Sequence, residues 1–294
     1  MRTNVALRTQ KSRNRGVHVF PRTEPGRAEL RWPEGVQWKE ELRKAFEVQD
    51  RLFPQCRPPV PGMDYAGICR PALGVSGDWY DFIPLGSQRL GLLLADVSGK
   101  GMPAALLGAA LHTAVRAIAP TAGQDCGEVL ARVNRLFFET TAAHRFATVF
   151  YGVYDPHTRI LTYANAGHYP PLLLNGGPEC IRLHSLTPPV GILPTLPPAQ
   201  QSIQLAGGDW LVIISDGISE ACDAAGKQFG DDRLLQILDR QRDATASELC
   251  HRVLDAVMNY SRGRKQADDL TLVAASIDSR DGVPTEAANL VAGS

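Results

Sequence analysis

The sequence predicts an α+β fold built as a layered sandwich, and three features of the chain carry this prediction. Short apolar runs recur along the chain, each bounded by Gly, Pro, Asn or Asp, as β-strands usually are. Helical segments come in pairs between blocks of strands instead of alternating with single strands, which favours layers of sheet and helix over a βαβ repeat. The segment YDPHTRI, between Val153 and Leu161, is typical of a hairpin turn, so part of the sheet is expected to be antiparallel.

The N-terminal part precedes the predicted domain in two pieces. Residues 1–33 are rich in arginine and poor in apolar residues, and we expect a disordered basic arm. Residues 34–63 follow as an amphipathic linker or regulatory helix, which Pro54 stops, and a proline-rich connector, RPPVPG. The globular domain is expected at 64–278, with a loose tail at 279–294.

The strands of this domain are predicted from the apolar runs. Some runs alternate apolar and polar residues, and others are continuously apolar as buried strands are. They are YAGICR (65–70), WYDFIP (79–84), LGLLLA (90–95), ATVFYGVY (147–154), RILTYAN (159–165), PPLLL (170–174), QSIQLA (201–206), WLVIIS (210–215) and LTLVAASI (270–277).

The helices are predicted from their start signals. Pro103 suits a first helical position. Asp125 and Glu128 resemble a capping box at the start of a second helix, which pairs with the helix that begins near Pro103. Two further helices are expected late in the chain, at 231–241 and 247–261.

Composition excludes several classes of protein. The chain has 294 residues, of which 44% are hydrophobic and 21% charged, with zero formal net charge, and nucleic-acid binders normally carry a basic excess. We found no signal-peptide core and no window near the about 20 apolar residues that span a bilayer. The six scattered cysteines include no C-x-x-C pair, which fits neither a zinc site nor a disulfide framework. We therefore expect a cytoplasmic protein without nucleic-acid or membrane partners.

Aspartates stand at the ends of four predicted strands. Asp78 begins one, Asp96 and Asp216 each follow an apolar run, and Asp268 with Asp269 precedes the last. A single aspartate of this kind is usually turn or cap chemistry. Four that converge would repel one another unless cations neutralised them, and an all-oxygen ligand set selects Mg²⁺, Mn²⁺ or Ca²⁺. Spacing alone leaves both interpretations open.

A set of motifs in a fixed order resembles one protein family. The motifs are ELRKAFEVQDRLFPQ, GVSGDWYDF, LADVSGKGMPAAL, FATVFYGVYD, YANAGHYPPLLL, PPVGILP, ISDGISEACDAAGKQFGDDRL and ADDLTLV. Together they resemble the SpoIIE-like (RsbU-like) branch of the metal-dependent, PPM-type protein serine/threonine phosphatases, over roughly residues 38–277. The resemblance implies a four-layer α-β-β-α sandwich, with two central and mainly antiparallel sheets flanked by helix pairs.

The resemblance also implies a centre of two Mn²⁺ or Mg²⁺ ions. Asp96 would bridge both ions, and the Val97 carbonyl would add a ligand. Asp216 and Asp268 would bind one ion, with Asp269 beside them in support. Asp96, Asp216 and Asp268 are therefore the expected catalytic residues.

The other ion is assigned to Asp78, with Asp81 nearby as the competing carboxylate. The sequence also departs from the wider superfamily. Ser98 stands where animal members carry a histidine that is a candidate general acid. The arginine with which those members bind phosphate has no counterpart here. Arg70 and Lys100 are candidates for that role by location only.

The activity that the resemblance implies is hydrolysis of phosphoserine or phosphothreonine by a water that the binuclear centre activates. The implied substrate is a phosphorylated anti-sigma-factor antagonist of the STAS type. The helix at 34–53 is expected to bind a regulator or a second copy of the chain. Two alternatives stay open: a catalytically silent pseudophosphatase that binds the partner on the same fold, and a phosphatase for small metabolites.

Overall fold

The computed structural model describes residues 36–142, 144–175, 180–240 and 244–279. The chain divides into two units, Met1–Lys39 and Glu40–Ser294, and the description below concerns the second. The predicted basic arm, and the predicted tail apart from Ser279, lie outside the described residues.

Two five-stranded sheets form the centre of the second unit, and every strand pair within them is antiparallel. The first sheet has the order β1-β10-β9-β6-β7, and the second has the order β2-β3-β4-β5-β8. The strands are β1 (Met63–Arg70), β2 (Asp78–Pro84), β3 (Leu90–Val97), β4 (Ala147–Asp155), β5 (Ile160–Ala166), β6 (Leu172–Leu174), β7 (Cys180–Arg182), β8 (Gln201–Gln204), β9 (Trp210–Ile214) and β10 (Leu270–Ile277).

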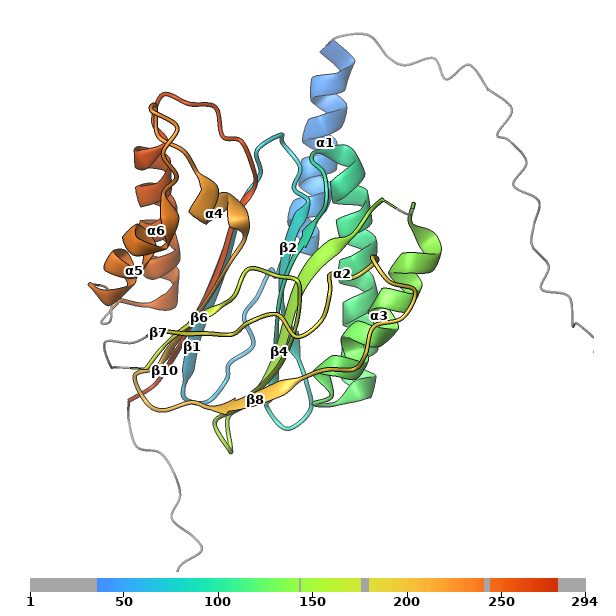
Figure 1. Cartoon of the computed structure of the whole chain (residues 1–294), viewed down its shortest axis with the longest axis vertical. Helices are drawn as coiled ribbons and strands as arrows, with labels where there is room; N and C mark the ends of the chain where they lie inside the picture. Colours follow the sequence, from blue (N-terminus) through green and yellow to red (C-terminus); the bar gives the residue numbers. More distant parts are fainter. Residues whose placement is uncertain (1–35, 143, 176–179, 241–243, 280–294) are drawn as a thin grey trace, which may run out of the picture. The chain divides into compact units, whose positions relative to one another are not determined.

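Helices cover the outer face of each sheet (Figure 1). The pair α2 and α3 packs on the second sheet, and α5 and α6 pack on the first. The helices are α1 (Val36–Leu52), α2 (Met102–Ala122), α3 (Cys126–Thr140), α4 (Asp216–Glu220), α5 (Gly230–Asp239) and α6 (Ala246–Tyr260). The predicted α+β sandwich of four layers, helix pair, sheet, sheet and helix pair, is confirmed.

The core has three apolar layers because alternate residues of each strand point to opposite faces of its sheet. On β3, Leu92 and Leu94 are buried between the two sheets, while Leu93 and Ala95 pack beneath α2 and α3. The same alternation places Asp96 on the face between the sheets, at the end of the strand.

Most predicted elements are present within a residue or two of their expected bounds. The predicted hairpin joins β4 to β5, with Asp155 opposite Ile160. The Asp125 side chain accepts the Glu128 backbone N–H at 2.9 Å and so caps α3. The sequence did not predict β7, a three-residue strand without an apolar run of its own that pairs with β6.

Helix α2 is an exception to the expectation about apolar windows. By length and composition alone it could cross a membrane, but one such helix is weak evidence, since the core helix of a soluble protein passes the same test. Its residues Leu111, Val115 and Ala119 are buried against the second sheet. We therefore interpret α2 as a layer of the sandwich.

Candidate metal centre

Two of the predicted ligands lie side by side at one end of the second sheet. Asp78, the first residue of β2, is directly opposite Asp96 near the end of β3. Asp96 is in turn opposite Thr148 on β4. Directly opposed residues of antiparallel strands have their Cβ atoms about 5 Å apart. The antiparallel register therefore brings the two carboxylates together across neighbouring strands.

The first sheet supplies the other two aspartates where β9 ends and β10 begins. Asp216 is the first residue of α4, two residues after the end of β9, and Asp268 lies two residues before β10. A Cβ on Gly217 would lie 2.1 Å from the Asp269 carbonyl oxygen, far inside contact distance. Gly217 does not take a positive φ, so the glycine follows Asp216 because two backbones approach closely, and not because a turn requires it.

The charges of these aspartates act on one another. Burial, then the charges of Asp216 and Asp268, raises the pKa of Asp96 to about 7. Burial, then the charge of Asp96, raises the pKa of Asp78 well above its usual value. Burial, then the charge of Asp268, raises the pKa of Asp216. Four aspartates from four chain segments therefore form a single electrostatic cluster, which supports convergence over isolated turn chemistry.

The donor set of this cluster fits hard divalent cations. Its side-chain donors are carboxylate oxygens, as Mg²⁺ and Mn²⁺ prefer. Asp78 Oδ2 is buried and has no hydrogen-bond partner among the described residues, so it is an acceptor that lacks a cation or a donor. In the described part of the chain, no three His, Cys, Asp or Glu side chains are placed to hold one ion as they stand. An ion held by three of these carboxylates would therefore require at least one of them to shift.

Asp269 braces the loop that leads to Asp78. Its Oδ1 accepts the Ala72 N–H and its Oδ2 accepts the Gly77 N–H, each at 2.7 Å. Both oxygens are already used, so the geometry favours the supporting position that the sequence suggested over direct ligation. Val97, whose carbonyl is the predicted backbone ligand, is fully buried, and its N–H donates to the Gly77 carbonyl.

Asp81 lies on the opposite face of β2 from Asp78 and outside the cluster. It is fully buried, and its carboxylate contacts His112 Nε2 at 2.7 Å and Arg116 Nη2 at 3.2 Å, both on α2. Burial opposes its ionisation, but the hydrogen bonds from His112 and Arg116 outweigh burial and lower its pKa. Asp81 therefore anchors α2 to the sheet, and Asp78 is the carboxylate that faces the site.

Helix α1 contacts the same loop from its other side. The Gln49 side chain donates to the Ser76 carbonyl at 2.7 Å and accepts the Ser76 N–H at 2.8 Å. The ring of Phe53, just beyond the helix, stacks on Trp79 at 5.1 Å between centroids. The predicted apolar face of α1 is only partly buried, because Phe46 remains 40% exposed.

Sequence reasoning did not assign roles to several polar residues beneath the cluster. The hydroxyls of Thr271 and Ser215 lower the pKa of Asp78 and so partly offset its burial. His168 is buried and contacts Thr148 Oγ1 at 2.9 Å, and burial lowers its pKa to about 3. Strand alternation could have placed Thr271 on the face between the sheets, but not beside Asp78.

The residues that depart from the family pattern lie close to the Asp96 turn or at its margin. Ser98 Oγ accepts the Phe146 N–H at 3.0 Å, and the Ser98 carbonyl accepts Arg145 Nη1 at 2.9 Å. Arg70 is exposed and donates to Gln266 Oε1 at 3.2 Å. Lys100 contacts Asp268 directly. Arg145, which the sequence did not single out, is thus the arginine that contacts the turn.

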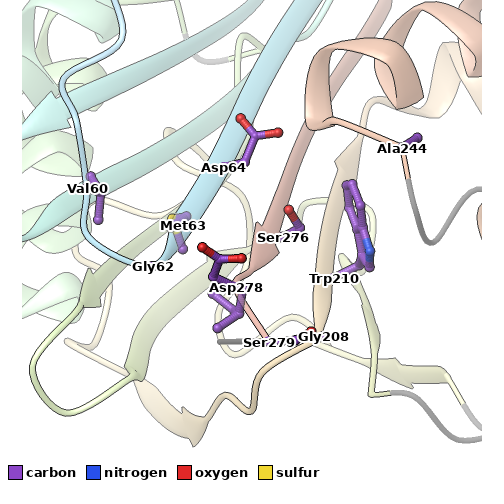
Figure 2. A pocket seen from close by; sticks show the side chains of 11 residues that line it. Val60, Gly62, Met63, Asp64, Gly208, Trp210, Ala244, Ser276, Asp278 and Ser279 are labelled. Atoms are coloured by element: carbon purple, nitrogen blue, oxygen red, sulfur yellow. The ribbon is translucent and has the colours of Figure 1, made fainter. Parts of the chain in front are cut away.

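A cavity of about 360 Å³ lies at the other end of the first sheet, where β1 and β9 begin and β10 ends (Figure 2). Asp64, Trp210 and Asp278 are among the residues that line it. Asp64 Oδ2 already accepts the Ala246 N–H at 2.7 Å. None of the four clustered aspartates lines this cavity, so it is separate from the candidate metal centre.

Comparison with known proteins identifies the family. The sequence model of Stage II sporulation protein E (SpoIIE) matches residues 86–278. The chain belongs to the SpoIIE family. The matched span includes Asp96, Asp216 and Asp268 but begins after Asp78, so the position of Asp78 rests on the structure.

Curated relatives of the SpoIIE-family chain include two larger proteins. The phosphoserine phosphatase RsbU of Bacillus subtilis is 29% identical over 80% of this chain and 69% of its own length. Protein IcfG of Synechocystis is 28% identical over 80% of this chain and 41% of its own length. The chain thus spans less than half of IcfG and about two thirds of RsbU.

Solved structures show the same fold. The SiaA PP2C domain of Pseudomonas aeruginosa superposes with a TM-score of 0.74 at 19% identity, covering 82% of this chain and 98% of that domain. RsbX, crystallised in complex with magnesium, superposes with a TM-score of 0.55 at 16% identity, covering 75% of this chain and 98% of that chain. At these identities the likeness establishes the PP2C-like fold, and one protein with this fold has been crystallised with a divalent metal.

Proposed function

We propose that this SpoIIE-family chain is a metal-dependent protein serine/threonine phosphatase. The observation that carries the proposal is the single electrostatic cluster of Asp78, Asp96, Asp216 and Asp268, built from separate strand ends. The relatives RsbU and RsbP are named phosphoserine phosphatases, which supports the same activity. We propose that the catalytic domain spans residues 64–278.

The cluster would hold two Mn²⁺ or Mg²⁺ ions. Asp96 would serve both, Asp78 and the Val97 carbonyl would serve one, and Asp216 and Asp268 would serve the other. Such ions, when bound, lower the pKa of water and neutralise the charge of a transferring phosphoryl group. The chain's own contribution is to fix the carboxylates on rigid strand ends.

A covalent enzyme intermediate is not part of this proposal. Cys69 lies within reach of the Asp78 charge, with its Sγ 3.3 Å from Ser76 Oγ. Burial raises its pKa to about 12, so the thiol stays protonated and is a poor nucleophile. Ser98 Oγ accepts the Phe146 N–H, and no basic side chain in the described part of the chain forms a hydrogen bond with this hydroxyl. Direct attack by water is therefore the reaction that the residues support, with the leaving-group proton supplied by solvent.

The substrate that we propose is a phosphorylated anti-sigma-factor antagonist of the STAS type, in the cytoplasm. This choice of substrate rests on the resemblance to RsbU-like proteins. We also propose that helix α1 connects a regulator or a second copy of the chain to the Asp78 loop, since Gln49 of this helix is hydrogen-bonded to Ser76 of the loop.

Metal removal tests the proposed activity. We expect hydrolysis of an aryl phosphate in Mn²⁺ or Mg²⁺, and loss of that activity in excess chelator, because an all-carboxylate site needs hard cations. The measurement is phosphate release from the aryl phosphate, from a panel of phosphorylated antagonist proteins, and from sugar phosphates as controls.

Three outcomes would contradict this proposal. Full activity after exhaustive chelation would exclude the metal mechanism. Tight binding of the phosphoproteins without phosphate release would identify a pseudophosphatase. Preference for the sugar phosphates would identify a metabolite phosphatase.

A further inference from the structure

Lys100 forms an ion pair with a predicted metal ligand. Its Nζ lies 2.7 Å from Asp268 Oδ2 and donates to the Ala267 carbonyl at 2.6 Å. Among the described residues, no other Lys, Arg or His forms an ion pair with Asp78, Asp96, Asp216 or Asp268. The ammonium is thus the cation that the protein itself supplies to the carboxylate cluster.

The backbone holds Lys100 in this position. The flanking residues Gly99 and Gly101 have φ values of 100° and 69°, in the region that favours glycine. A Cβ on Gly99 would lie 2.3 Å from Arg145 Nη1, and this guanidinium donates to the Ser98 carbonyl at 2.9 Å. The turn therefore requires glycine on both sides of Lys100, and Arg145 braces its first half. Lys100 extends from this turn to Asp268 and Ala267, just before β10.

We propose that Lys100 competes with the divalent cation for Asp268 and so sets the metal affinity of the site. This inference rests on the metal centre of the proposed function. Binding an ion to Asp268 would break the ion pair and place two like charges, the ion and the ammonium, near one carboxylate. Lys100 thereby stabilises the metal-free protein and weakens its affinity for the ion.

The size of the effect follows from exposure. The Lys100 and Asp268 side chains are 47% and 40% exposed, so water screens the pair and its contribution is moderate. We expect Lys100→Met, which keeps the length of the side chain and removes the charge, to tighten Mn²⁺ binding about fivefold. With chelator, the variant should unfold at a lower temperature than the parent, and at saturating Mn²⁺ this difference should vanish or reverse.

The experiment is titration of Mn²⁺ by calorimetry, with thermal unfolding in chelator and in Mn²⁺, on the full chain. Lys100→Arg keeps the charge and should restore the parent affinity. Lys44→Met is the matched control, because Lys44 forms an exposed ion pair with Glu41 at 2.9 Å on α1, away from the cluster. It should leave Mn²⁺ affinity unchanged.

The outcomes separate this inference from the proposed function. If Lys100→Met bound Mn²⁺ as tightly as the parent or more weakly, the proposed competition for Asp268 would be wrong. The proposed metal centre would be unaffected by that result. Unchanged Mn²⁺ affinity with a raised KM for the aryl phosphate would also contradict the competition. It would indicate that Lys100 binds the phosphate group of the substrate instead. Absence of Mn²⁺ binding by both proteins would overturn the inference and the proposed function together.

Discussion

Asp96→Asn is expected to reduce phosphate release by orders of magnitude and to weaken Mn²⁺ binding in the same variant. Asparagine keeps the shape of the side chain but removes the charge at the centre of the cluster, where Asp96 is coupled to Asp78, Asp216 and Asp268. Generation of the nucleophile depends on cations held there, so rate and metal affinity should fall together. The measurements are phosphate release and Mn²⁺ titration.

The same variant should be more stable than the parent in chelator at neutral pH. The pKa of Asp96 is about 7 in the folded protein against a usual 3.8, so the folded state binds more protons than the unfolded state between these values. Stability of the metal-free parent therefore falls as pH rises from about 4 to 7. Asp96→Asn should weaken this slope, and the two proteins should converge near pH 4 in thermal unfolding.

The control for Asp96→Asn is Asp125→Asn. Asp125 caps α3 by accepting the Glu128 N–H at 2.9 Å, and asparagine caps a helix about as well as aspartate. Its rate and metal affinity should stay near those of the parent. Near-full activity of Asp96→Asn would instead show that the strand-end aspartate is ordinary turn chemistry.

Gly217→Ala is expected to damage the site by moving backbone. The added Cβ would lie 2.1 Å from the Asp269 carbonyl oxygen and 3.2 Å from the Asp268 Cβ, so the start of α4 and the segment before β10 must separate. We expect a loss of about 1–3 kcal/mol in the free energy of unfolding, as for other overpacked sites. Phosphate release should fall about a hundredfold or more, because displacement of catalytic groups by 1 Å can have that effect.

Gly86→Ala provides the matched control for Gly217→Ala. A Cβ there meets no atom within 4 Å, and Gly86 has no positive φ, so rate and stability should be unchanged. Chemical denaturation and phosphate release measure both effects. If Gly217→Ala kept the stability and the rate of the parent, the two segments could separate without loss of either. The close approach of the Asp216 and Asp268 segments would then not be needed for activity.

The fold and the positions of the four aspartates could be predicted because both depend on local patterns. Apolar runs bounded by turn residues located the strands and the aspartates at their ends. In the structure, alternation from Leu92 and Leu94 then places Asp96 on the face between the sheets. The ordered motifs then assigned the ends of β2, β3, β9 and β10 to one site. Strand register supplies the geometric reason, since Asp78 pairs with Asp96 directly.

The remaining features depend on contacts between distant segments, which no local pattern encodes. Gln49 and Ser76 are separated by 27 positions, and Lys100 and Ala267 by 167. The sequence could not distinguish the roles of Asp78 and Asp81. Only the packing of α2 brings His112 and Arg116 to the Asp81 carboxylate. For the same reason, the sequence could not show that the backbone at Gly217 closely approaches the Asp269 carbonyl.

The location of bound metal tests the central claim, that strand-end aspartates from both sheets form one divalent-cation site. The measurement is an anomalous difference map from crystals of the full chain grown with Mn²⁺, collected near the manganese absorption edge. We expect two peaks that share Asp96, one also contacting Asp78 and the other contacting Asp216 and Asp268. Manganese bound elsewhere, or no peak within ligand distance of Asp96 in crystals of the active protein, would contradict it.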